Sequence, residues 1–128
     1  MFHNVDEMRL GEVARLLNAE PISPRYDPDL EIRTAFGADL MSDVLSFSQP
    51  GVLLLTGLTT PQVVRTAEVA GVAAIVFVRG KKALPETERL GAEAGIPLLR
   101  TSLIMFDACG RLYQAGLRGC SVPSNATK

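Results

Sequence analysis

Residues 51–80 read GVLLLTGLTTPQVVRTAEVAGVAAIVFVRG, and this stretch decides the fold. Its two apolar runs, residues 52–56 and residues 73–78, do not alternate with polar residues. Unbroken apolar runs of this length are typical of strands that are buried on both faces. The stretch therefore predicts a strand–helix–strand unit in a sheet whose centre is parallel.

The helix of this unit has a signal at each end. Thr60 suits the N-cap, Pro61 suits the first helical position, and Gly71 can adopt the left-handed conformation that ends a helix. We expect a helix over residues 61–70, preceded by a turn over residues 57–60.

Other segments extend the unit on both sides. Apolar periodicity predicts helices over residues 10–17, 38–47, 85–94 and 103–117, and strands over residues 31–36 and 96–99. We expect Asp39 or Ser42 to cap the second helix, and Thr101 or Ser102 to cap the last one. This order predicts an α/β fold: a three-layer α/β/α domain with a mostly parallel central sheet.

Length and composition restrict the function. At 128 residues we expect one domain, residues 1–120, followed by a flexible tail, residues 121–128. A hydrophobic content of 47% against 21% charged residues favours self-association, and residues 103–117 are apolar on more sides than one sheet face covers. We therefore expect a homo-oligomer, most simply a dimer. The alternative is that the helix over residues 10–17 or the helix over residues 85–94 covers the last helix within one chain. A net charge of −1 offers no general attraction to nucleic acid or to a membrane.

The cysteines and the single histidine do not suggest a metal site. Cys109 and Cys120 have no CxxC spacing, and His3 completes no familiar zinc pattern with them. Cys109 lies in an apolar helix pattern, so we expect an inert, buried thiol. The start of the chain lacks the order of a signal peptide, and no apolar run is long enough to span a bilayer, so we expect a cytoplasmic protein.

Polar loops are expected to gather at one edge of the sheet, because the carboxyl ends of parallel strands lie together and ligands of open α/β sheets bind there. Three loops supply candidate ligand-binding residues: Gly57, Thr59 and Thr60; Arg79, Gly80 and Lys81; Arg100, Thr101 and Ser102. Cations, hydroxyls and helix N-termini together favour a small anionic metabolite or a nucleotide. The chain has neither GxGxxG nor GxxxxGK[ST], so it predicts no dinucleotide cofactor and no P-loop.

No catalytic constellation is found. No G-x-S-x-G sequence raises a nucleophilic serine, and His3 stands alone. Asp39 and Asp43 lie four residues apart and would share a helical face, which suits acid/base chemistry or Mg²⁺. We favour the simpler role of carboxylates at a helix start, where they complement the helix dipole.

The order of segments resembles the DRTGG domain. The resemblance covers residues 8–117 and rests on residues 10–17, IRTAF at 32–36, GADLMSDVL at 37–45, the buried strand–helix–strand unit, AGIPLLRT at 94–101, and a last helix with Phe106 and GRLY at 110–113. Such domains occur alone or joined to CBS-domain pairs and phosphotransacetylases, and are similar to the N-terminal domain of HPr kinase/phosphorylase. The resemblance implies a regulatory or ligand-sensing module.

This chain departs from the family at its two signature turns. Leu58, Thr59 and Thr60 stand where the family places Asp-Arg, and Val78, Arg79 and Gly80 stand where it places Thr-Gly-Gly. We therefore expect a non-catalytic module that self-associates and binds a small anionic ligand. Two alternatives remain: an enzyme that uses Asp39, Asp43 and the basic edge on a phosphorylated substrate, and a structural subunit of a larger assembly.

Overall fold

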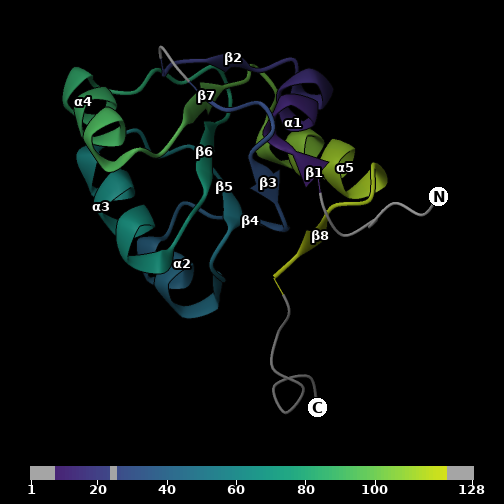
Figure 1. Ribbon diagram of the computed structural model, residues 1–128, viewed down its shortest axis with the longest axis horizontal. Coiled ribbons are helices and arrows are strands. Elements are labelled where there is room, and N and C mark those ends of the chain that lie inside the picture. The colour runs from purple at the N-terminus through teal and green to yellow at the C-terminus, as the bar shows by residue number, and fades with distance from the viewer. Residues whose placement is uncertain (1–7, 24–25, 121–128) are drawn as a thin grey trace.

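A computed structural model describes residues 8–23 and 26–120. It shows three layers, with a sheet between two layers of helices (Figure 1). The helices are α1 (Leu10–Leu17), α2 (Met41–Phe47), α3 (Pro61–Ala70), α4 (Pro85–Ala94) and α5 (Met105–Gln114). The strands are β1 (Met8–Arg9), β2 (Glu20–Pro21), β3 (Glu31–Ile32), β4 (Thr34–Gly37), β5 (Val52–Thr56), β6 (Ala74–Phe77), β7 (Leu98–Arg100) and β8 (Arg118–Gly119). The predicted three-layer α/β/α fold is thus confirmed.

The central sheet has six strands in the order β2-β7-β6-β5-β4-β8. Strands β4 to β7 run parallel, β8 joins parallel to β4, and β2 pairs antiparallel with β7. Strands β1 and β3 form a separate antiparallel pair. The sheet is therefore mostly parallel, as its unbroken apolar runs predicted.

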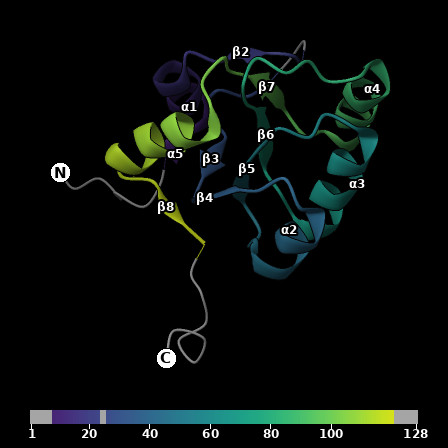
Figure 2. The same ribbon diagram turned by 180° about the vertical axis from the view of Figure 1, so that it is seen from behind.

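Alternate residues of the central strands face two different cores. Leu53 and Leu55 of β5 pack with α1 and α5, whereas Val52 and Leu54 pack with α2 and α3. Figure 2 shows the sheet from behind, again between α1 and α5 on one side and α2, α3 and α4 on the other. Because both faces of β5 are covered, its first four residues, Val52 to Leu55, are all apolar.

Helix α3 begins and ends where the sequence predicts. Pro61 is its first residue, and Gly71 ends it with a φ of 74°. Thr60 occupies the N-cap position, but its side chain makes no capping hydrogen bond. The position of the cap is confirmed, whereas the expected hydrogen bond is not formed.

Several boundaries and caps differ from the prediction. The expected strand over residues 31–36 is divided at Arg33 into β3 and β4, which belong to different sheets. Helix α2 starts at Met41 after the N-cap Leu40, and α5 starts at Met105 after the N-cap Ile104. Neither cap residue carries a side chain that can accept a hydrogen bond, so the expected caps from Asp39 or Ser42 and from Thr101 or Ser102 are wrong. The expected tail, residues 121–128, lies outside the described residues.

Candidate functional site

The loops at the carboxyl edge of the sheet divide between its two faces. The loops after β4, β5 and β6 lead to α2, α3 and α4 on one face, whereas the loop after β7 leads to α5 on the other (Figure 1). Ligands of open α/β sheets bind where neighbouring loops leave toward opposite faces. In this sheet, that point lies between β6 and β7.

The two loops at this point are joined by their backbones. The N–H of Arg79 donates to the carbonyl of Leu103 at 2.8 Å, and the N–H of Gly80 donates to the carbonyl of Thr101, also at 2.8 Å. These bonds hold the loop after β6 against the loop after β7. They also use backbone donors that would otherwise be free to bind a ligand.

Arg79 is held in an unusual conformation. Its φ is 61°, in the left-handed region, where a residue with a Cβ atom is strained by about 1–2 kcal/mol. Its guanidinium lies over Gly57: a Cβ atom at position 57 would be only 2.5 Å from Nη2 of Arg79. Because Gly57 has no side chain, the guanidinium of Arg79 has room to lie at the end of β5.

Asp39 contacts Gly57 as well. Its Oδ1 accepts hydrogen bonds from the N–H of Gly57 at 2.7 Å and from the hydroxyl of Thr56 at 3.1 Å. The same hydroxyl accepts from the N–H of Leu58 at 3.1 Å. The carboxylate is thereby fixed at the loop after β5. Asp39, Gly57 and Arg79, which follow three adjacent strands, are called the Gly57 site below.

Thr101 does not belong to this site. Its side chain is buried, and its hydroxyl donates to the carbonyl of Leu17 at 2.7 Å and accepts from the N–H of Leu103 at 3.2 Å. The hydroxyl joins the end of α1 to the loop before α5. The prediction that Thr101 binds a ligand is corrected, because both functions of its hydroxyl are already used inside the protein.

Arg100 and Thr59 also have structural partners. Arg100 forms an ion pair with Glu20 of the edge strand β2. The carbonyl of Thr59 accepts from the hydroxyl of Thr87 at 2.6 Å, which joins the loop after β5 to helix α4. Neither residue belongs to the group formed by Asp39, Gly57 and Arg79, and the ligand-binding roles of Arg100 and Thr59 stay predictions. Of the other predicted residues, Thr60, Lys81 and Ser102 are exposed at this edge.

The two predicted helix-start carboxylates have different roles. Asp43 lies in the first turn of α2, as expected. Asp39 precedes the N-cap of that helix and binds Gly57 instead, so its assignment to the helix start is corrected. The sequence did contain a signal for this role, because the carboxyl ends of β4 and β5 must be neighbours if consecutive strands pair.

The remaining side-chain chemistry is limited. Cys109 and Cys120 are free thiols, and Cys109 is half-buried rather than buried as expected. This burial raises the pKa of Cys109, which lowers the reactivity of its thiol. Within residues 8–23 and 26–120, no three His, Cys, Asp or Glu side chains are grouped so that they could hold a metal ion. In the same part of the chain, no helix is long and apolar enough to cross a membrane.

Comparisons with known proteins bear on the fold. No protein-family model matches the sequence, and no curated protein matches it. The chain is similar in structure to the CBS and DRTGG domains of the regulatory region of Clostridium perfringens pyrophosphatase, solved in complex with the activator diadenosine tetraphosphate. The TM-score is 0.70 at 15% sequence identity, and the match covers 85% of this chain.

The chain has a DRTGG-like fold. It spans about half of the clostridial chain, of which the match covers 47%. The two turns at which the sequence departs from the pattern of the DRTGG domain, Leu58–Thr60 and Val78–Gly80, follow β5 and β6. Arg79 supplies a cation directly after β6.

Proposed function

We propose that this chain is a regulatory, ligand-sensing module that has no catalytic role and binds a small anionic ligand at the Gly57 site. The observation that carries the proposal is the strained backbone of Arg79. A glycine would adopt this φ without strain, so an arginine here costs stability. Such a cost is typical of residues kept for function.

Charge and position favour an anion. Arg79, Lys81 and Lys82 are exposed on one loop, and helix α3 directs its N-terminus to the same edge. Planar, bidentate recognition of phosphate or carboxylate is the chemistry for which arginine is best suited. The clostridial regulatory region is complexed with diadenosine tetraphosphate, a polyphosphate nucleotide, which supports the same class of ligand for this chain.

Replacing Arg79 with glycine is expected to raise the stability of the fold and to weaken ligand binding. The free energy of unfolding should rise by up to about 1 kcal/mol, because the left-handed residue no longer carries a Cβ atom. Affinity for a nucleoside polyphosphate should fall by about tenfold or more, because the bidentate cation is lost. Chemical denaturation measures the first quantity, and calorimetric titration with ATP and with diadenosine tetraphosphate measures the second.

Two further variants sharpen this test. Gly57→Ala moves the guanidinium away, since the new Cβ would meet the end of a flexible side chain, and it should weaken binding while leaving Arg79 in the sequence. Arg33→Ala removes the same charge just before β4, at the opposite edge of the sheet, and should leave binding unchanged. Equal losses in Arg79→Gly and Arg33→Ala would mean that net charge, rather than a site, attracts the ligand.

We also propose that the module self-associates through α5. Phe106 is 82% exposed and Tyr113 is 62% exposed, although α1 packs against the same helix and Arg111 donates to the carbonyl of Leu16. Phe106 and Tyr113 lie seven positions apart, on one face of α5. A two-fold contact with a second copy would cover both aromatic rings.

Light scattering coupled to size exclusion tests this contact. At micromolar concentration the unmodified protein should elute with the mass of a dimer, and Phe106→Glu should give a folded monomer. Val69→Glu is the matched control, since Val69 is 79% exposed on α3, on the opposite side of the sheet. A monomeric unmodified protein would remove the proposal, and so would dissociation by Val69→Glu alone.

A further inference from the structure

Helix α5 presents one face on the outside of the protein. Phe106, Gly110 and Tyr113 follow one another at helical spacing along this face, and all three are exposed. Ala108 and Leu112, on the other side of the helix, are buried in the core that α5 shares with the sheet. The surface formed by Phe106, Gly110 and Tyr113 is called the α5 face below. Exposed aromatic rings that lie together in this way are typical of a surface that a partner covers.

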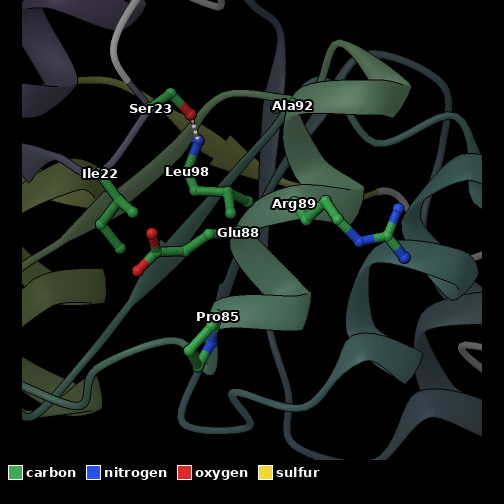
Figure 3. A pocket seen from close by; sticks show the side chains of 7 residues that line it. All are labelled: Ile22, Ser23, Pro85, Glu88, Arg89, Ala92 and Leu98. Atoms are coloured by element: carbon green, nitrogen blue, oxygen red, sulfur yellow. Dashed lines mark hydrogen bonds between the residues drawn. The ribbon is translucent and has the colours of Figure 1, made fainter.

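Gly110 differs from the glycines of the other helices. Glycine inside a helix lowers stability relative to alanine, so it usually marks a close approach of another group. A Cβ atom at Gly11 of α1 would lie 3.2 Å from Cβ of Pro28, and one at Gly91 of α4 would lie 2.8 Å from Cδ1 of Leu98, which Figure 3 shows beside this helix. A Cβ atom at Gly110 would meet nothing within 4 Å. Gly110 therefore leaves room for a group from outside the described part of the chain.

The charges beside the α5 face complement themselves. Asp107 lies in the first turn of α5 and Arg111 in the last turn, four positions apart on the same flank of this face. Within residues 8–23 and 26–120, neither side chain forms an ion pair, and Arg111 donates to the carbonyl of Leu16 at 3.1 Å instead. A carboxylate toward the start of a helix and a guanidinium toward its end match a second copy that runs in the opposite direction, because each charge then meets its opposite.

We propose that two copies of the chain associate by an antiparallel crossing of their α5 helices, centred close to Gly110. The inference rests on the self-association proposed above and specifies its geometry. Phe106 of each copy lies against the partner's Tyr113, and Asp107 of each copy faces the partner's Arg111. The distance between two packed helices depends on the side chains at their contact, so a glycine at the centre lets the two backbones approach closely.

Complementary charge reversals test the antiparallel direction by analytical ultracentrifugation. Asp107→Arg sets like charges against each other at both contacts, and so does Arg111→Asp, so each variant alone should raise the Kd of the dimer by about twofold to fivefold per contact. An equimolar mixture of the two variants should regain the Kd of the unmodified protein, because each chain then meets its complement. A contact within one chain cannot be rescued by mixing. Glu68→Arg, the same change of charge at an exposed position on α3, should leave the Kd unchanged.

A disulfide cross-link tests the centre of the crossing. In a chain whose Cys109 and Cys120 are replaced by serine, Gly110→Cys should give a covalent dimer on oxidation with diamide, because the two introduced thiols lie beside the two-fold axis. Val69→Cys, at an equally exposed position on α3, should remain a monomer on a denaturing gel. A monomeric unmodified protein would overturn this inference together with the self-association. A dimer that shows neither rescue by mixing nor the Gly110→Cys cross-link would overturn the antiparallel crossing alone.

Discussion

Replacing Thr101 with valine is expected to lower the free energy of unfolding by about 2–3 kcal/mol. Valine keeps the shape of the side chain but leaves the carbonyl of Leu17 and the N–H of Leu103 without their partner. Buried groups that lose a hydrogen bond in this way cost about 1–3 kcal/mol each. The change is measured by urea denaturation at constant m-value.

Thr101→Ser is the matched control for this prediction. It keeps the hydroxyl and removes one buried methyl group, so about 1 kcal/mol of stability should be lost. Folded Thr101→Val protein should bind nucleoside polyphosphates with unchanged affinity, because the hydroxyl faces the interior. If Thr101→Ser lowered the free energy of unfolding as much as Thr101→Val, the hydrogen bonds of the hydroxyl would contribute little to stability. A loss of affinity in Thr101→Val would show that Thr101 does belong to the binding site.

The second large effect is expected at Asp39. Alanine at this position should lower the free energy of unfolding by about 2 kcal/mol, because the carboxylate accepts from the buried N–H of Gly57 and from the hydroxyl of Thr56. The loop after β5, against which the guanidinium of Arg79 lies, would lose its anchor. Affinity for a nucleoside polyphosphate should therefore decrease as well, despite the removal of a negative charge.

Replacing Asp39 with asparagine distinguishes the effect of its hydrogen bonds from the effect of its charge. Asp39→Asn keeps an oxygen that can accept from Gly57, so it should cost less than about 1 kcal/mol, and the removal of the negative charge should strengthen anion binding. Calorimetric titration of both variants with ATP gives the comparison. Equal binding by the alanine and asparagine variants would show that Asp39 acts only through its charge.

The centre of the fold could be predicted because its signals are local. In β5, Val52 and Leu54 face one core, while Leu53 and Leu55 face the other. A single apolar run in the sequence therefore indicates burial on both faces of the strand. Pro61 and Gly71 set the ends of α3 through their own backbone preferences. The ends of α3 can therefore be predicted without knowing which residues pack against Pro61 and Gly71.

The caps could not be predicted in the same way. Leu40, Leu84 and Ile104 occupy the N-cap positions of α2, α4 and α5, and none has a side chain that accepts a hydrogen bond. The nearby Thr101 contributes its hydroxyl to α1 instead. A hydroxyl near a helix start is a strong local signal, and here tertiary packing overrides it.

The candidate site was predicted in position but only partly in composition. Its edge follows from the parallel strands, and Gly57 and Arg79 lie where the loops were expected. The pairing of Arg100 with Glu20 spans 80 residues, and no local pattern reveals it. The left-handed Arg79 could not be foreseen either, because Gly80 beside it is the residue that the sequence favours for positive φ.

The attachment of α1 has an entropic consequence. Parallel strands β4 to β7 pair with neighbours that follow one helix later in the chain, whereas α1 is fastened by Thr101, 84 residues from its partner Leu17. Closing a flexible loop of that length costs about 4 kcal/mol, a cost that grows only with the logarithm of its length. Once the sheet has formed, its rigid strands shorten the flexible path. The contacts of α1 are therefore favourable chiefly after the sheet has assembled. We expect α1 to dock late in folding, after β4 to β7 have paired.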